Sequence, residues 1–307
     1  MRSLKIAIVQ KSPVFFNLKK CLDLAIASIE EAADNNCKLI TFGETWLSGY
    51  PAFLDFCPEV GYWDSKNMKK VFANIYKNSV EIESKTTDML CEKAKKHGIS
   101  LVMGINEIAK KPIGTIFNSI LTINEKGQIA NVHRKLMPTF TEKLVYGIGD
   151  GAGLNAVKAS WGKFGSLVCW EHWMPLTRQA MHIEGEDLHI ACWPSVHEKH
   201  QIASRQYAFE GRCFVIAVGQ MMKKGQIPTE LKLPPNTNPN EWLLNGGSCV
   251  IAPNGEYLLE PQFNQEKMIY YTIEDLDKVI EERMTLDVTG HYNRNDVFEF
   301  NINKKRL

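Results

Sequence analysis

The hydrophobic positions of this chain follow two repeating patterns, one with a period of two and one with a helical period. Residues 4–10 have large apolar side chains at every second position, Leu4, Ile6 and Ile8, and predict a strand. Residues 17–36 place apolar side chains at helical spacing, and residues 38–42 form a short apolar run that stops at Gly43 and Glu44. The first part of the chain therefore predicts a strand, a helix and a second strand, in that order.

The same alternation of helical and strand-like segments continues through the chain. An amphipathic helix is predicted over residues 86–97 with Gly98 as its C-cap, and a strand follows over residues 99–104. The later segments predict a hairpin of residues 116–123 and 128–135 turned at 124–127, strands at 165–169, 188–192, 214–218, 248–252 and 257–260, a turn at 253–256, and a helix at 201–210.

The order of these elements predicts the fold class. No linker, repeat or low-complexity stretch divides the chain, and residues 222–242, rich in Pro, Asn and Lys, predict a long surface loop rather than a boundary. Alternating helices and strands with added hairpins are typical of an α/β domain with mixed sheets. We therefore expect one domain over residues 1–307, a length that is sufficient to bury a full core.

Charge and hydropathy narrow the classes of partner. The 36 basic and 35 acidic residues leave a net charge of +1, which does not point to nucleic acid or to an anionic membrane. The dense basic run at residues 304–306 predicts a solvated tail. No apolar stretch approaches the roughly 18 residues that a membrane helix needs, and the chain starts with a strand pattern rather than a signal peptide. We expect a cytoplasmic protein with reduced thiols and no nucleic-acid or membrane partner.

Among the eight cysteines, one has an unusual setting. The others that we assign occupy apolar or helical contexts typical of small core residues, namely Cys21, Cys37, Cys91, Cys192, Cys213 and Cys249. Cys169 ends the apolar run 165–168 and is followed directly by Trp170, Glu171 and His172. A thiol at the carboxyl end of a buried strand is a candidate nucleophile, because the thiolate is the best side-chain nucleophile near neutral pH.

Two further chemistry-bearing side chains end strand-like runs in the same way. Glu44 follows the run 39–43, and Lys135 follows the run 129–134. An acid, a lysine and Cys169 at equivalent strand ends would converge in one pocket. Taken singly, each has a structural alternative, because a strand-end Glu or Lys can be a solvated turn residue and a cysteine can be a core residue.

The segments around these three residues resemble the nitrilase branch of the carbon–nitrogen hydrolase superfamily. The three blocks that share the family's order and spacing are residues 44–51 (ETWLSGYP), 133–139 (HRKLMPT) and 169–176 (CWEHWMPL). Further similar blocks are residues 147–151 (GIGDG), 210–215 (EGRCFV) and 290–298 (GHYNRNDVF), so the resemblance extends over nearly the whole chain.

This resemblance implies a site and a fold. It implies a triad of Glu44, Lys135 and Cys169, with Glu142 as a second acid. It also implies a four-layer α-β-β-α sandwich with two mixed β-sheets, assembled as a homodimer or a higher homo-oligomer. We expect residues 280–307 to form a C-terminal tail at a subunit interface.

The implied activity is the hydrolysis of a small-molecule nitrile to the carboxylic acid and ammonia, with no cofactor. Glu44 would take the thiol proton, and Lys135 would stabilise the negative charge that develops on nitrogen. The intermediates would be a thioimidate and then an acyl thioester on Cys169. Glu142 would position substrate or water, or orient Lys135, and the backbone N–H of Trp170 is a candidate oxyanion donor.

Several neighbouring side chains are candidates for a supporting role. Those that flank the motif loops, and could form aromatic pocket walls for a flat or apolar R group, are Tyr50, Trp173, Trp193 and His197. For each of them the alternative is a place in the core or in an interface. Glu171 is expected either to pair with Lys135 or to solvate its loop. His172 is expected either to tune amide against acid release or to make a loop hydrogen bond.

The sequence leaves other functions open. His197 and His200 are one helical turn apart, but no cysteine or carboxylate pair completes a metal site, so we expect no metal. Within the superfamily, the alternatives are an amidase or carbamoyl-type amidohydrolase and a cyanide hydratase. Outside it, the alternative is a catalytically silent interaction module with the same fold. The residues after Cys169 and the block 290–298 favour a nitrilase.

Overall fold

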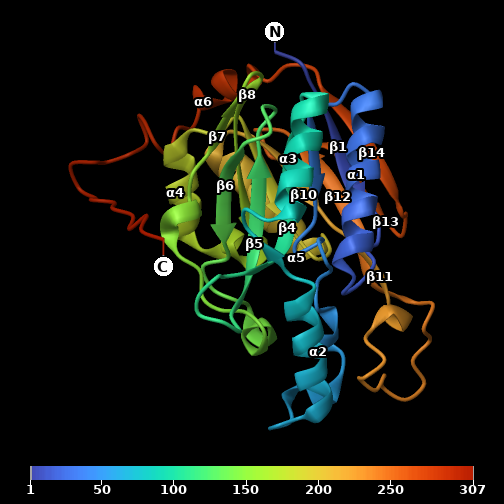
Figure 1. The fold of residues 1–307 in the computed structure, drawn as a ribbon. Helices are drawn as coiled ribbons and strands as arrows, with labels where there is room; N and C mark the ends of the chain where they lie inside the picture. The colour runs from blue at the N-terminus through green and yellow to red at the C-terminus, as the bar shows by residue number, and fades with distance from the viewer. Residues whose placement is uncertain (1, 307) are drawn as a thin grey trace.

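A computed structural model describes residues 2–306, and within them the chain forms two seven-stranded β-sheets with helices on the outside (Figure 1). The first sheet has the order β14-β1-β2-β4-β5-β6 with β3 beside β4, and the second has the order β11-β12-β10-β9-β8-β7 with β13 beside β12. Both sheets contain parallel and antiparallel neighbours, so both are mixed, as predicted.

The bounds of the elements are as follows. The first sheet contains β1 (Leu4–Gln10), β2 (Leu39–Phe42), β3 (Val80–Glu81), β4 (Ser100–Ile108), β5 (Ile116–Ile123), β6 (Ile129–Arg134) and β14 (Lys267–Ile273). The second contains β7 (Val157–Ala159), β8 (Gly162–Val168), β9 (Leu188–Cys192), β10 (Phe214–Val218), β11 (Met221–Lys223), β12 (Trp242–Ile251) and β13 (Tyr257–Phe263). The α-helices are α1 (Leu18–Asp34), α2 (Lys66–Lys77), α3 (Lys85–His97), α4 (Pro175–Glu184), α5 (Glu198–Gly211) and α6 (Lys278–Arg283).

The alternation of side chains along β1 shows how the layers are built. Ile6 and Ile8 belong to the core between the two sheets, whereas Ala7 and Val9 belong to a second core beneath α1 and α3. Helices α4 and α5 cover the outer face of the second sheet, where Met181 packs. The result is the predicted four-layer α-β-β-α arrangement. The largest apolar cluster fills the space between the two sheets and continues under α4 and α5 on the outer face of the second sheet.

Several predicted elements are confirmed. Strands β9 and β10 match their predicted ranges, and every residue in both is buried, which explains why their sequences are apolar except for His189 in β9. Gly98 ends α3 with a positive φ of 59°, so it is the predicted C-cap. The hairpin of β5 and β6 turns at residues 124–127, where the Asn124 N–H donates to the Gln128 carbonyl.

Other predictions differ from the structure. Strand β8 ends at Val168, so Cys169 lies beyond the strand rather than in it. Strand β12 begins at Trp242, well before the predicted range 248–252. The predicted loop 222–242 overlaps β11, a short 3-10 helix, Lys224–Gln226, and the first residue of β12, whereas residues 227–241 contain no helix or strand. The missed elements are α2, α4, α6, β3, β7, β11 and β14.

The thiols are mostly as predicted, whereas the basic run at the C-terminus differs from its prediction. All eight cysteines are free, and five of the six assigned to the core are buried, but Cys91 is only half-buried. The basic run 304–306 is exposed yet not simply solvated, because Lys304 pairs with Glu184 and Arg306 pairs with Asp150. No helix among residues 2–306 is long and apolar enough to cross a membrane. Met1 and Leu307, which the predicted domain and tail include, lie outside the described residues.

Candidate active site

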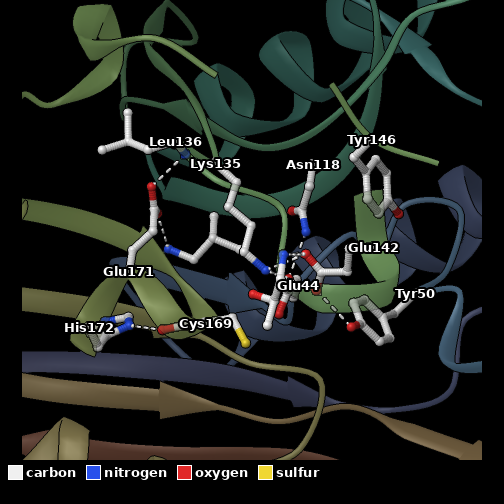
Figure 2. Close-up of polar contacts among 12 residues, drawn as sticks. Glu44, Tyr50, Asn118, Lys135, Leu136, Glu142, Tyr146, Cys169, Glu171 and His172 are labelled. Atoms are coloured by element: carbon white, nitrogen blue, oxygen red, sulfur yellow. Dashed lines mark hydrogen bonds and ion pairs between the residues drawn. The ribbon is translucent and has the colours of Figure 1, made fainter. Parts of the chain in front are cut away.

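Three strand ends bring the candidate catalytic side chains together (Figure 2). Glu44 follows β2, Lys135 follows β6, and Cys169 follows β8. The lysine comes from one sheet and the thiol from the other, so the site lies where the two sheets face each other. The convergence expected from three equivalent strand ends is therefore observed in the structure.

Lys135 lies between two carboxylates. Its Nζ is 2.9 Å from Oε1 of Glu44, and it is 2.9 and 2.7 Å from Oε1 and Oε2 of Glu142. All three side chains are at most 2% exposed. A buried lysine with two buried carboxylates is costly to assemble unless each group is paired, and these distances are those of charge-assisted hydrogen bonds.

Further donors fix the carboxylates. The Asn118 amide donates to Oε1 of Glu44 at 2.6 Å. The Tyr50 hydroxyl donates to Oε1 of Glu142 at 2.8 Å, and the Thr139 N–H donates to Oε2 of Glu142 at 2.8 Å. Glu142 is thus held at both oxygens. Oε2 of Glu44 is buried and has no hydrogen-bond partner among residues 2–306. It is the oxygen of this cluster that is free to accept a proton.

The backbone at Cys169 is unusual. Its φ is +49°, in the left-handed region that non-glycine residues rarely adopt, and the residue opens a short 3-10 helix, Cys169–Trp173. The sulfur points toward the charged cluster (Figure 2), and the backbone N–H of Trp170 is hydrogen-bonded to it. A residue held in this conformation at a strand end presents its side chain to the cavity, which is consistent with a functional position.

Burial and the surrounding charges set the protonation of the site. Burial raises the pKa of Glu44 to about 7, although Lys135 opposes the shift. Burial and the Glu44 charge raise the pKa of the Cys169 thiol well above its usual value. Burial disfavours the Lys135 ammonium, but the nearby anionic groups, Glu44 first, outweigh it and raise the pKa of Lys135. Near neutral pH the resting site therefore holds a thiol, an ammonium and a base that is ready to ionise.

Glu171 has neither of the two roles expected from the sequence. Its Oε1 accepts from the Leu136 N–H and its Oε2 accepts from the Val168 N–H, both at 2.8 Å, and Nε2 of His133 lies 2.8 Å from Oε2. Glu171 therefore ties the end of β6 to the end of β8, which are the residues next to Lys135 and to the thiol. It does not reach the lysine ammonium because the two backbone amides and the imidazole engage both of its oxygens.

One candidate wall residue, Trp193, and one candidate supporting residue, His172, lie behind the site and do not border the cavity. His172 is buried, and its Nδ1 is 2.7 Å from the Cys169 carbonyl, which is the loop hydrogen bond given as its alternative. Trp193 is also buried, stacks on His172 and donates from Nε1 to Ser204. Both side chains face the layer of α5 rather than the cavity, because the 3-10 helix turns the chain away from the sheet after Cys169.

A cavity of about 990 Å³ opens onto the thiol. Of the predicted wall residues, Tyr50, Trp173 and His197 border it, as do Trp170 and Glu142. Further bordering side chains that the sequence did not identify are Asp55, Met137, Phe140, Met174, His200, Leu243 and Leu244. Met137 and Met174 lie within the motif blocks and Phe140 directly follows one, whereas the two leucines at the start of β12 had no signal in the sequence. The wall is largely apolar, with the charged cluster at one end.

Comparison with known proteins identifies relatives over the full length of the chain. The carbon–nitrogen hydrolase family model matches residues 5–281. An aliphatic nitrilase of Sinorhizobium fredii is 30% identical over 307 residues, covering 99% of this chain and 97% of the relative. An arylacetonitrilase of Aspergillus niger is 32% identical over 315 residues, covering 98% and 89%. Among solved structures, a carbon–nitrogen hydrolase of Helicobacter pylori has the same fold, with a TM-score of 0.71 at 19% identity and 97% coverage of both chains.

Proposed function

Because the chain belongs to the carbon–nitrogen hydrolase family and has nitrilases among its relatives, we propose that it hydrolyses a nitrile to the carboxylic acid and ammonia through an acyl thioester on Cys169. One observation carries the proposal. A buried ammonium is held between two carboxylates, and one carboxylate, Glu44, keeps a free oxygen at the site of a buried thiol. These are the groups that nucleophilic attack on a weak electrophile requires.

The first step forms the carbon–sulfur bond. Glu44 takes the thiol proton through its free Oε2, and the sulfur attacks the nitrile carbon. Negative charge develops on the nitrile nitrogen, where the Lys135 ammonium and the Trp170 N–H stabilise it. The proton taken from sulfur then passes to the nitrogen. The product of this step is a neutral thioimidate, with no atom gained or lost beyond the thiol and the nitrile.

Two waters complete the reaction. The first gives a proton to Glu44 as its oxygen adds to the thioimidate carbon, and Glu44 returns that proton to the nitrogen. The hydroxyl proton of the tetrahedral intermediate then also passes to the nitrogen, the carbon–oxygen double bond forms, and the carbon–nitrogen bond breaks to release ammonia. The remaining thioester is attacked by a second water, activated in the same way, which frees the carboxylic acid and restores the thiol. Glu142 supports both steps by holding Lys135 in place and by facing the cavity in which the waters must lie.

The cavity supports a nitrile with an apolar R group. Trp170, Trp173 and Met174 line it together with Leu243 and Leu244, and a volume of about 990 Å³ accommodates an aromatic ring. One of the two relatives is named an aliphatic nitrilase and the other an arylacetonitrilase, so their names support both an aliphatic and an arylacetic R group. The apolar aromatic wall favours the larger, flatter class.

The same proposal includes the surrounding organisation of the protein. We infer one catalytic domain over residues 1–307, acting in the cytoplasm as a homodimer or a higher homo-oligomer, with residues 280–307 at a subunit interface. Eight free thiols support a reducing compartment. Exposed apolar side chains on α4 and α5, Leu176, Ile183, Ile202 and Phe209, support an interface on that face.

Ammonia release tests the function. The protein is assayed with aliphatic, aromatic and arylacetic nitriles and with the matching amides, and the acid and amide products are quantified. We expect acid and ammonia from nitriles, and a loss of at least about 10⁴-fold for Cys169→Ala. Cys249→Ala, which removes a buried thiol in β12 outside the cavity, is the matched control and should keep the parental rate.

Two outcomes would contradict the proposal. If Cys169→Ala released ammonia from a nitrile at the parental rate, the thiol would not be the nucleophile. If the protein turned over amides but no nitrile in the panel, it would be an amidase that uses the same groups.

A further inference from the structure

A row of buried polar side chains begins at the Cys169 carbonyl and leads away from the cavity. Nδ1 of His172 lies 2.7 Å from that carbonyl, and Nε2 of His172 lies 3.1 Å from Nε2 of His189. Nδ1 of His189 lies 2.9 Å from Oε1 of Glu186, and the Tyr207 hydroxyl donates to Oε2 of Glu186 at 2.6 Å. The four side chains are at most 2% exposed and none of them borders the cavity.

The carbonyl at one end of the row determines the direction of every hydrogen bond in it. A carbonyl only accepts, so Nδ1 of His172 carries a proton. If His172 is neutral, its Nε2 is a lone pair, and Nε2 of His189 must donate to it. A neutral His189 then has a lone pair at Nδ1, so the proton in the last contact must come from Glu186. Two neutral imidazoles and an ionised carboxylate together carry two protons for these three contacts. The contacts require three, so the row holds one additional proton.

We propose that Glu186 is a neutral carboxylic acid that, through His189 and His172, fixes the Cys169 carbonyl and positions the nucleophile. Glu186 is a positioning residue, because it touches neither the substrate cavity nor the reacting atoms. The restraint matters at Cys169 because its left-handed φ of +49° has to be maintained by surrounding contacts.

The additional proton resides on the carboxyl group rather than on an imidazole. Among residues 2–306, no lysine or arginine forms an ion pair with the Glu186 carboxyl. The basic side chain within ion-pair distance of this carboxyl is His189. Burial raises the pKa of Glu186 to about 8. Burial and the neighbouring His189 lower the pKa of His172 to about 3, and burial lowers the pKa of His189 well below its usual value. Both imidazoles are therefore neutral at pH 7.

The surroundings of this row contain several other titratable or charged groups. On the strands and the segments next to them, these are Lys163 on β8, His133 near the end of β6, Glu171 after β8, Asp187 before β9 and Cys213 before β10. On the helices, they are Arg178, His182 and Glu184 on α4, Tyr207 and Glu210 on α5, and Arg283 on α6. The glycine at position 165 makes room for the carboxyl, because a Cβ there would lie 1.9 Å from Oε1 of Glu186.

Loss of the proton would break the row. When Glu186 ionises, two lone pairs face each other at one of the three contacts, so at least one of them opens. Opening at His172 releases the Cys169 carbonyl. The effect on turnover rests on the proposed function, whereas the protonation of Glu186 does not depend on any substrate.

Infrared difference spectroscopy tests the protonation directly. The spectrum of the wild-type protein minus that of Glu186→Gln, both at pH 7, should contain the carbonyl band of a protonated carboxyl group. The band should be replaced by carboxylate bands above pH 8. Carboxylate bands at pH 7 would overturn the proposal. The infrared measurement needs no substrate, so it can be interpreted even if the protein is inactive on every nitrile. Inactivity would contradict the proposed function, whereas carboxylate bands at pH 7 would contradict the protonation of Glu186.

The kinetic test uses two substitutions at Glu186. In Glu186→Gln, the amide donates to His189 and its oxygen accepts from Tyr207, so kcat at pH 7 should stay within about threefold of wild type. The wild-type kcat should fall as the pH rises through about 8, and this fall should be absent from the glutamine variant. Glu186→Leu has no donor and should lose about 10-fold to 100-fold in kcat with little change in KM.

A matched control is available two residues after Cys169. Glu171 is equally buried and also contacts a histidine, but backbone amides donate to both of its oxygens, so it must be a carboxylate acceptor. Glu171→Gln places an amide NH₂ against a donor and should lower the thermal stability, whereas Glu186→Gln should not. Equal destabilisation by the two substitutions, or identical pH profiles for wild type and Glu186→Gln, would overturn the proposal.

Discussion

Glu44 combines full burial with an oxygen atom that has no hydrogen-bond partner among residues 2–306. Water cannot solvate its charge, and Lys135 compensates for only part of that loss. The carboxyl group is therefore balanced between its two protonation states near pH 7. This balance suits a general base, because a group with a pKa near the working pH both removes and returns protons readily.

The pH dependence of kcat/KM tests this role for Glu44. Glu44 has to be ionised to accept the thiol proton, and burial raises its pKa to about 7, so kcat/KM should fall as the pH decreases through that value. Asn118→Leu removes a donor to the carboxylate, which destabilises the charged form, so the acid limb should move to higher pH. Asn131→Leu, which loses only contacts to backbone carbonyls, should leave the limb in place. An acid limb unmoved by Asn118→Leu would remove Glu44 from this role.

At the residue scale, the sequence identified the side chains that end apolar runs. Glu44, Lys135 and Cys169 have a local signal of this kind, and Glu142 followed from the resemblance alone. The partners of Glu171 and the position of Glu186 could not be predicted, because both depend on which strand ends become neighbours in the folded chain. A buried carboxyl group that must stay protonated has no signature in the linear sequence.

At the element scale, the site depends on close approach between two strands. Gly104 in β4 lies directly against the end of β2, where a Cβ would be 2.1 Å from the Gly43 carbonyl oxygen and 2.3 Å from the Thr45 nitrogen. These backbone atoms flank Glu44 and cannot move without moving it. The glycine is thus required for space, not for an unusual backbone conformation.

Gly104→Ala should therefore reduce both stability and activity. Overpacking against backbone typically costs about 1–3 kcal/mol, and displacement of Glu44 should lower kcat as well. Thermal unfolding and the nitrile assay measure the two effects. Gly61→Ala is the control, because its added Cβ would meet no atom within 4 Å, and it should be close to neutral. Full activity and unchanged stability in Gly104→Ala would show that β2 and β4 are not packed as described.

The elements that sequence patterns predicted best are the fully buried ones. Strand β10 is a continuous apolar run and β9 is apolar except for His189, so the limits of both strands could be predicted. Helix α4 was missed because its buried face includes polar residues, Thr177, Arg178 and His182, which interrupt the apolar period. Helix α2 was missed because it buries only Val71 and Ile75. Strand β14 was missed because four of its seven residues are only half-buried, which weakens the contrast between its faces.

At the scale of the whole molecule, α4 and α5 both carry exposed apolar side chains. Leu176 and Ile183 on α4 and Ile202 and Phe209 on α5 are all more than 36% exposed, and the two helices are joined by the ion pair of Arg178 with Glu210. Residues that are distant in the sequence form this surface, so composition and net charge gave no sign of it. Its position beside Cys169–Trp173 connects any subunit contact there to the active site.

Ile202→Glu tests the predicted oligomer. A buried charge at a subunit contact is unfavourable, so the substitution should shift the mass measured by light scattering toward that of the monomer. Leu24→Glu, which places the same charge on an exposed position of α1, is the control and should leave the mass unchanged. A wild-type protein that is monomeric at micromolar concentration would contradict the predicted assembly.

The most direct test of the central claim is the mass of the protein during turnover. Wild-type protein is mixed with an arylacetonitrile, quenched with acid within a few turnovers, and analysed by intact and peptide mass spectrometry. We expect an added acyl group, located on the peptide that contains Cys169 and absent from Cys169→Ala. Steady release of ammonia and acid with no adduct on Cys169, or with an adduct on another residue, would contradict it.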